Sequence, residues 1–192
     1  MIRDDLLKGP VGESAAAALA RLKEFNDALR DQTDWIYHVD YQAAGLHGLA
    51  EAERGLGIRL PPSYMRLLSD HGLPYIGYGK NSKPDPLLFE PRQLRPGDHC
   101  VYDPEDLLHV PAEELDAVMD RLRASAAFQQ TDSGAYNYAM FRTDLVNEDG
   151  EMPVSLYLHD EVYEDPEGFV TFDQYISAFV DESNAGQAED YA

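Results

Sequence analysis

A short acidic segment in the last quarter of the chain has side chains that could bind a partner by charge. Five of the eight residues between 160 and 167 are Asp or Glu, and their mutual repulsion costs stability unless something offsets it. The segment lacks the alternating oxygen ligands, central Gly and final Glu of an EF-hand loop. Two interpretations stay open: a solvated loop that aids solubility, and an electrostatic contact for a basic protein.

Tyrosines in the same part of the chain could supply the aromatic anchors that dominate the energy of many protein interfaces. Charge would then speed association, and the rings would hold the complex. The predicted partner-binding residues are Tyr136, Tyr138, Tyr157, Asp160, Glu161, Tyr163, Glu164, Asp165 and Glu167.

Two other patterns suggest chemistry but lack the residues that the chemistry requires. A phosphate-binding loop ending at Gly79-Lys80 would need Gly at position 74 and Ser or Thr at 81, where Pro74 and Asn81 stand. His99-Cys100 offers a base and a nucleophile, but adjacent side chains in an extended segment point to opposite faces. We therefore expect a surface loop and a structural thiol.

Metal-ligand patterns are also missing from the sequence. The six histidines form no HExxH arrangement, and a single cysteine excludes a multi-cysteine zinc site within the chain. His159-Asp160-Glu161 could join a metal site, but the end of a strand is the preferred interpretation. The sequence thus predicts no metal, no cofactor and no catalytic residue.

The overall charge narrows the class of partner. The 192 residues include 36 acidic and 15 basic side chains, for a net charge of -21. The 50 residues after Arg142 hold 14 of the acids and no Lys or Arg. Such a chain repels nucleic acid and anionic membranes, which leaves a basic protein or a cation as the expected partner.

The expected compartment is the cytoplasm. Cys100 is the only cysteine, so no internal disulfide can form. The first five residues do not resemble the start of a signal peptide, and no segment approaches the ~20 apolar residues of a membrane span.

Apolar spacing predicts helices in the first two thirds of the chain and at its end. Residues 14–31 form the first, with Ser14 as its cap, and the Trp35-Ile36-Tyr37 cluster packs it onto the rest. The other predicted helices cover residues 44–56, the short segment from Pro61-Pro62 to His71, 111–127, and the region around 172–179.

Alternating residues predict strands in the final third, at 136–141, 154–158 and 168–172. Asn147-Glu148-Asp149-Gly150 has the composition of a hairpin turn. Residues 73–98 read mostly as loop because of their Pro and Gly content, with one short strand at 87–89. Residues 183–192 read as an acidic flexible tail. The predicted class is α+β, with a mainly antiparallel sheet flanked by helices.

A segment between residues 49 and 72 resembles the opening signature of the SUKH superfamily: an acid before Leu-Gly, then Leu-Pro, Tyr, a short apolar helix and Gly. The residues that match it are Glu53, Leu56, Gly57, Leu60, Pro61, Tyr64, Leu67, Leu68 and Gly72. Each of these residues can be explained by structure alone: it ends a helix, fixes a turn by packing, or packs its ring in the core.

The resemblance covers residues 46–182 as one SUKH-like α+β domain, with residues 1–45 as an N-terminal helical extension packed on it. It implies a protein-binding role without catalysis. Bacterial members of the superfamily are chiefly immunity proteins that neutralise polymorphic toxins, often nucleases or deaminases. An acidic plug would block the basic substrate groove of such a toxin. The alternative, implied by fungal relatives, is a regulatory or adaptor scaffold that binds a cellular protein.

Overall fold

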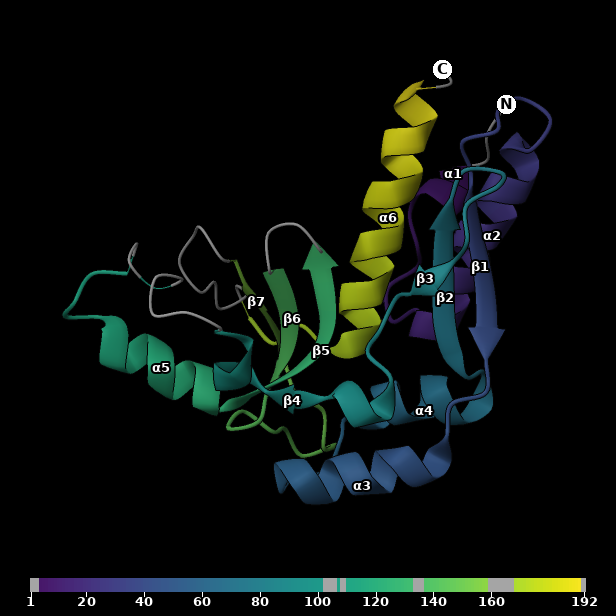
Figure 1. The fold of residues 1–192 in the computed structure, drawn as a ribbon. Coiled ribbons are helices and arrows are strands. Elements are labelled where there is room, and N and C mark those ends of the chain that lie inside the picture. Colours follow the sequence, from purple (N-terminus) through teal and green to yellow (C-terminus); the bar gives the residue numbers. More distant parts are fainter. Residues whose placement is uncertain (1–3, 102–106, 108–109, 133–136, 159–167, 191–192) are drawn as a thin grey trace. The chain divides into compact units, whose positions relative to one another are not determined.

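The computed structural model describes residues 4–101, 107, 110–132, 137–158 and 168–190. Within these residues the chain is α+β, with two antiparallel sheets and six α-helices (Figure 1). The predicted α+β class and the antiparallel strand pairing are confirmed, but the described residues form two sheets where one was predicted.

The chain divides into two compact units, each made of segments that are distant in sequence. Unit 1 combines Met1–Ala43, Ser63–Leu87 and Phe172–Ala192, and unit 2 combines Ala44–Pro62 and Leu88–Thr171. This division differs from the predicted boundaries at 45 and 182, because the N-terminal helices belong to the same unit as the C-terminal helix.

Unit 1 contains a three-stranded antiparallel sheet in the order β1-β2-β3 and two long helices, α2 and α6, that pack side by side. Its elements are α1 (Asp4–Leu7), α2 (Ala15–Leu29), β1 (Tyr37–Gln42), most of α4 (Pro62–Asp70), β2 (Leu73–Tyr78), β3 (Asp85–Pro86) and α6 (Phe172–Asp190).

Helix α2 forms where the sequence predicts it. The backbone N–H of Ala17 donates to the side chain of Ser14 at 3.3 Å, which makes Ser14 the N-cap. The apolar residues that recur every three or four positions along the helix are buried: Ala15, Leu19, Leu22, Phe25 and Leu29. Phe25 and Leu29 pack with Ile36, so the segment before β1 does anchor the helix.

Helix α6 is longer than predicted and includes residues that the sequence assigns to a flexible tail. It runs to Asp190, and polar side chains from its second half are buried. Asn184 Nδ2 donates to the carbonyl of Leu6 at 2.7 Å, and Gln187 Nε2 donates to that of Trp35 at 3.1 Å. The predicted third strand does not form, since Gly168 to Thr171 lie outside any strand and α6 begins at Phe172.

Strand β2 occupies part of the predicted loop, and β1 was also not predicted. Pro74 is tolerated within β2 because β3 pairs with β2 only at Tyr75 and Ile76. Pro74 has no N–H to donate, but β3 does not extend far enough to need a hydrogen bond from this position. The predicted strand at 87–89 is wrong, since β3 ends at Pro86.

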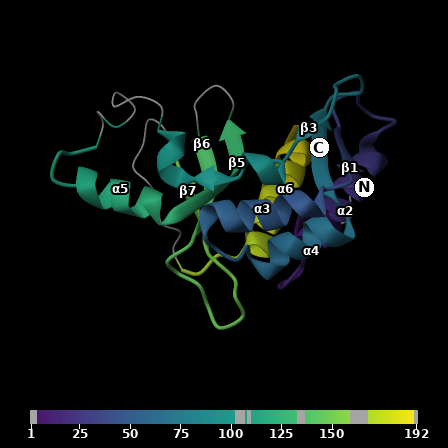
Figure 2. The same cartoon turned by 60° about the horizontal axis from the view of Figure 1, so that its bottom comes forward.

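Unit 2 contains a four-stranded antiparallel sheet in the order β4-β5-β6-β7, whose last three strands are seen from a second direction in Figure 2. Its elements are α3 (Leu46–Leu56), two short 3-10 helices η1 (Pro91–Gln93) and η2 (Gly97–Cys100), β4 (Arg95–Pro96), α5 (Leu115–Arg123), β5 (Ser125–Asp132), β6 (Asn137–Arg142) and β7 (Val154–Tyr157).

Strands β6 and β7 confirm the predicted hairpin. The turn between them is closed by the N–H of Gly150, which donates to the Asn147 carbonyl at 3.0 Å, and Gly150 has the positive φ expected of this position. The predicted helix over 111–127 is too long, because α5 ends at Arg123 and the alanines that follow lie in β5. Ala126 and Ala127 are buried in the sheet, so tertiary packing outweighs their helix propensity.

The signature residues have structural roles. Gly57 ends α3 in the left-handed conformation, and the Glu53 carboxylate accepts the N–H of Leu60 at 3.0 Å. Leu60 and Pro61 are buried, and α4 begins at Pro62. In unit 1, Tyr64 packs edge-on against Phe172 with ring centroids 5.3 Å apart, and Gly72 has a φ of 95°. Leu56 is partly buried.

None of the helices in the described part of the chain is long and apolar enough to cross a membrane.

Candidate protein-binding surface

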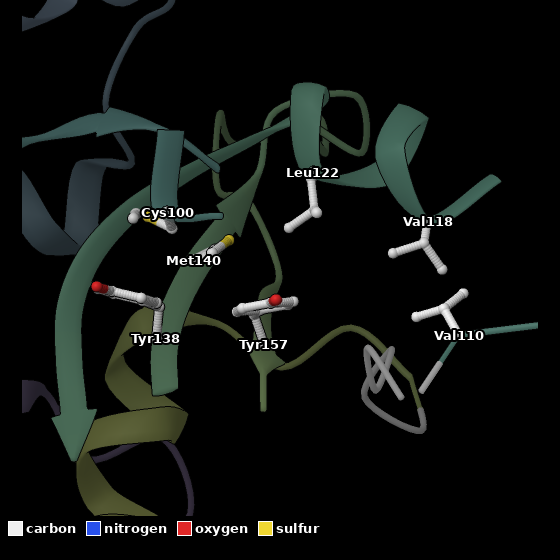
Figure 3. Close-up of a cluster of buried hydrophobic side chains, with 8 residues drawn as sticks. Cys100, Val110, Val118, Leu122, Tyr138, Met140 and Tyr157 are labelled. Atoms are coloured by element: carbon white, nitrogen blue, oxygen red, sulfur yellow. The ribbon is translucent and has the colours of Figure 1, made fainter. Parts of the chain in front are cut away.

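Two of the predicted anchor tyrosines lie in the core of unit 2. Tyr138 on β6 and Tyr157 on β7 are each 1% exposed. They belong to a buried cluster with Cys100, Met140 and Leu122, in which Figure 3 shows their side chains. The expectation that these rings reach a partner is therefore corrected. Alternation in a strand identifies a face, but it does not say whether that face is exposed.

The remaining predicted partner-binding residues lie outside the described residues. They are Tyr136, Asp160, Glu161, Tyr163, Glu164, Asp165 and Glu167.

The structure instead brings exposed aromatic side chains together on the β1–β2 pair of unit 1. Tyr37 pairs directly with Tyr78, and Val39 with Ile76. Directly opposite residues of an antiparallel pair project from the same face, so Tyr37, Tyr41 and Tyr78 share one face. Trp35, just before β1, contacts Tyr78 with ring centroids 5.8 Å apart. We call Trp35, Tyr37, Tyr41 and Tyr78 the aromatic face.

Three of these four rings are accessible, whereas Tyr37 is partly buried and Val39, between Tyr37 and Tyr41 on the same strand face, is only 7% exposed. Trp35 is 60% exposed, Tyr78 43% and Tyr41 39%. The centroids of Tyr37 and Tyr78 are 4.8 Å apart, so neighbouring rings hold one another in place while their outer surfaces face solvent. A rigid group of Trp and Tyr rings loses little side-chain entropy when a partner covers it, as expected of an interface anchor.

Acidic side chains flank the aromatic face. Asp85 on β3 pairs with Ile76 and therefore projects on the same side as Tyr78, and its side chain is exposed. Asp34 immediately precedes Trp35, and its Oδ1 lies 2.9 Å from Lys80 Nζ. Carboxylates at the rim of an aromatic patch favour a basic partner.

The sequence contains a signal for this surface. Trp35, Tyr37, Val39 and Tyr41 alternate with smaller or polar residues at a period of two, which is typical of a strand. On β2, Pro74 and Gly77 conceal the equivalent pattern, because both residues are depleted in strands.

The Gly77-Tyr78-Gly79-Lys80 segment has no phosphate-loop geometry. Gly77 and Tyr78 end β2, and Gly79 adopts a φ of 94° in the turn that leads toward β3. A phosphate-binding loop would lead into a helix N-terminus. In the described ranges, no group of three His, Cys, Asp or Glu side chains is placed to hold a metal ion.

The thiol of Cys100 is buried, whereas the adjacent His99 is exposed. Burial is the main cause that raises the pKa of Cys100 to about 11 from its ordinary 9.0; Asp98 adds to the rise, and Arg95 opposes it. A thiol with this pKa stays protonated at neutral pH and is a poor nucleophile.

Cys100 is therefore expected to react with a disulfide reagent at pH 8 about 100-fold more slowly in the native protein than in the unfolded chain. The same pKa rise means that native stability decreases above about pH 9, where only the unfolded thiol ionises. Absorbance of the released thiol measures the reaction, with the protein in denaturant as reference. Equal rates in the two states would show that the native thiol is accessible.

Comparison with known proteins gave no match among protein-family models, curated proteins or solved structures. The resemblance to the SUKH superfamily therefore stays a prediction based on the residues of the signature.

Proposed function

We propose that the chain is a non-catalytic binding domain that holds a basic protein through the aromatic face. Within this class, we infer that it is an immunity protein and that the partner is a toxin domain of the nuclease or deaminase type. The observation that carries the proposal is the exposure of Trp35, Tyr41 and Tyr78 on one strand pair, next to Asp34 and Asp85.

The charge of the chain supports a basic partner. A net charge of -21 attracts a basic surface over long distances and raises the association rate at low ionic strength. Charge alone does not hold a complex together, since exposed ion pairs contribute only about 0–1 kcal/mol each. The aromatic rings supply the desolvated area that such an interface needs. The resemblance at residues 49–72 supports the immunity role.

Co-expression tests the biological role. A toxin encoded beside the gene is expressed in a bacterial host with and without this chain, and survival is scored. Rescue of growth supports the immunity role. A lack of rescue, together with a stable complex between this chain and another protein, would favour the regulatory scaffold.

Replacing Trp35 or Tyr78 with Ala is expected to weaken the toxin complex by about 10- to 100-fold, because each change removes an exposed ring that the partner would cover. Isothermal titration calorimetry measures the dissociation constant. Both positions are exposed, so little stability should be lost.

The matched control is Phe169→Ala, which removes a ring that is 41% exposed and that belongs to unit 2 rather than to the aromatic face. It should leave the affinity unchanged. Should Phe169→Ala weaken the complex while Trp35→Ala and Tyr78→Ala do not, the aromatic face is not the binding surface.

A further inference from the structure

An open pocket of about 400 Å³ lies beside two rings of the aromatic face. It is lined by Asp34, Trp35, Tyr78, Gly79, Lys80, Asn81 and Ser82. All of these residues belong to unit 1.

The aromatic wall of the pocket is suited to a cation. Trp35 and Tyr78 both line the pocket, with their rings tilted by 34° to one another. The face of an aromatic ring carries negative charge density, and Trp attracts cations most strongly. A Cβ atom added to Gly79 would lie 3.4 Å from the Trp35 ring, so the indole packs directly over the Gly79 backbone.

The residues that line this pocket already include a cation, Lys80, paired with the Asp34 carboxylate. Lys80 Nζ lies 2.9 Å from Asp34 Oδ1, with the two side chains 65% and 70% exposed. The Lys80 N–H also donates to the Asp34 carbonyl at 2.7 Å, so the two backbones stay together when the side chains separate. An ion pair this exposed is weak, and another cation can displace Lys80 at small cost.

We propose that this pocket binds an arginine side chain of the basic partner. The inference rests on the proposed function and adds the chemistry of the contact. The planar guanidinium stacks on the Trp35 and Tyr78 rings and donates hydrogen bonds to the Asp34 carboxylate, in the place that Lys80 Nζ now takes. Arginine suits the site better than lysine, because guanidinium both stacks on aromatic faces and pairs with a carboxylate through two N–H groups.

Trp35 is the only tryptophan in the chain, so its fluorescence reports directly on the pocket. The full chain is titrated with N-acetylarginine methylamide, and in parallel with the citrulline analogue, which has a planar but neutral head group. The arginine probe is expected to give a saturable change in Trp35 fluorescence and to bind about tenfold more tightly than the citrulline probe.

Three variants test the roles of individual residues in binding the arginine probe. Asp34→Asn should weaken arginine binding by about tenfold, because it removes the charged acceptor. Lys80→Ala should strengthen it by about threefold, because it removes the internal competitor. Lys83→Ala removes an exposed lysine that does not line the pocket and should have no effect.

Equal binding of the arginine and citrulline probes would overturn the proposal, as would tighter binding by Asp34→Asn or weaker binding by Lys80→Ala. These failures can be told apart from failure of the proposed function. If Trp35→Ala weakens the toxin complex but the arginine probe does not bind, the aromatic face is supported as the binding surface and the arginine pocket is refuted. If the probe binds but Trp35→Ala leaves the affinity for the toxin unchanged, the proposed function is refuted.

Discussion

Replacing Arg21 with Met is expected to lower the free energy of unfolding by about 3–5 kcal/mol, because it leaves a buried carboxylate without its cation. Arg21 and Glu13 side chains are only 6% and 5% exposed. Arg21 Nη2 lies 2.9 Å from Glu13 Oε2 and 2.6 Å from Asp181 Oδ1, while Nη1 donates to the Leu6 carbonyl at 3.1 Å. Chemical denaturation followed by circular dichroism measures the loss.

Arg30→Met is the matched control. Arg30 is the C-cap residue of the same helix and pairs with Asp27 at 2.6 Å, but both side chains are exposed, so the change should cost less than about 1 kcal/mol. Adding Glu13→Gln to Arg21→Met should recover part of the lost stability, since the unpaired charge is removed with its partner. Similar losses for Arg21→Met and Arg30→Met would contradict the buried pairing.

Tyr138→Ala is expected to destabilise the protein by about 3–5 kcal/mol, the cost of removing a fully buried ring and leaving a cavity. The Tyr138 ring packs beside Phe89 and lies 5.5 Å from the Arg95 guanidinium carbon. Tyr78→Ala, at an exposed position, should cost less than about 1 kcal/mol. Urea unfolding curves for the two variants make the comparison.

The two tyrosine variants separate core rings from surface rings. A small loss of stability for Tyr138→Ala would indicate that the ring lies at the surface, and it would support the prediction from the sequence that Tyr138 contacts the partner. A large loss for Tyr78→Ala would mean that the aromatic face is part of the packing of unit 1.

Elements whose local signals agree with one another could be predicted from the sequence. Helix α2 has both a Ser cap and a regular apolar stripe, and strands β6 and β7 join through a turn with Gly in the required position. Local signals are sufficient in these cases, because the cap, the period and the turn residue all agree.

Elements that depend on distant contacts could not be predicted. The second half of α6 is polar, and buried amides such as Asn184 satisfy backbone carbonyls of the N-terminal region, a contact that no hydrophobic pattern reveals. Strand β5 contains two alanines that favour a helix in isolation, yet it lies between β4 and β6. The aromatic face could not be predicted for the same reason, since it requires β1 to pair with β2.

The segments of unit 1 also determine when the protein can fold during synthesis. Asp173 accepts the N–H of Ala15 across 158 residues, and Asn184 reaches Leu6 across 178. Contacts so distant in sequence form late, because a long loop must close first. The residues of unit 2 emerge from the ribosome before α6 does, whereas unit 1 must wait for it. A partner that recognises the aromatic face would therefore require α6 to have been synthesised.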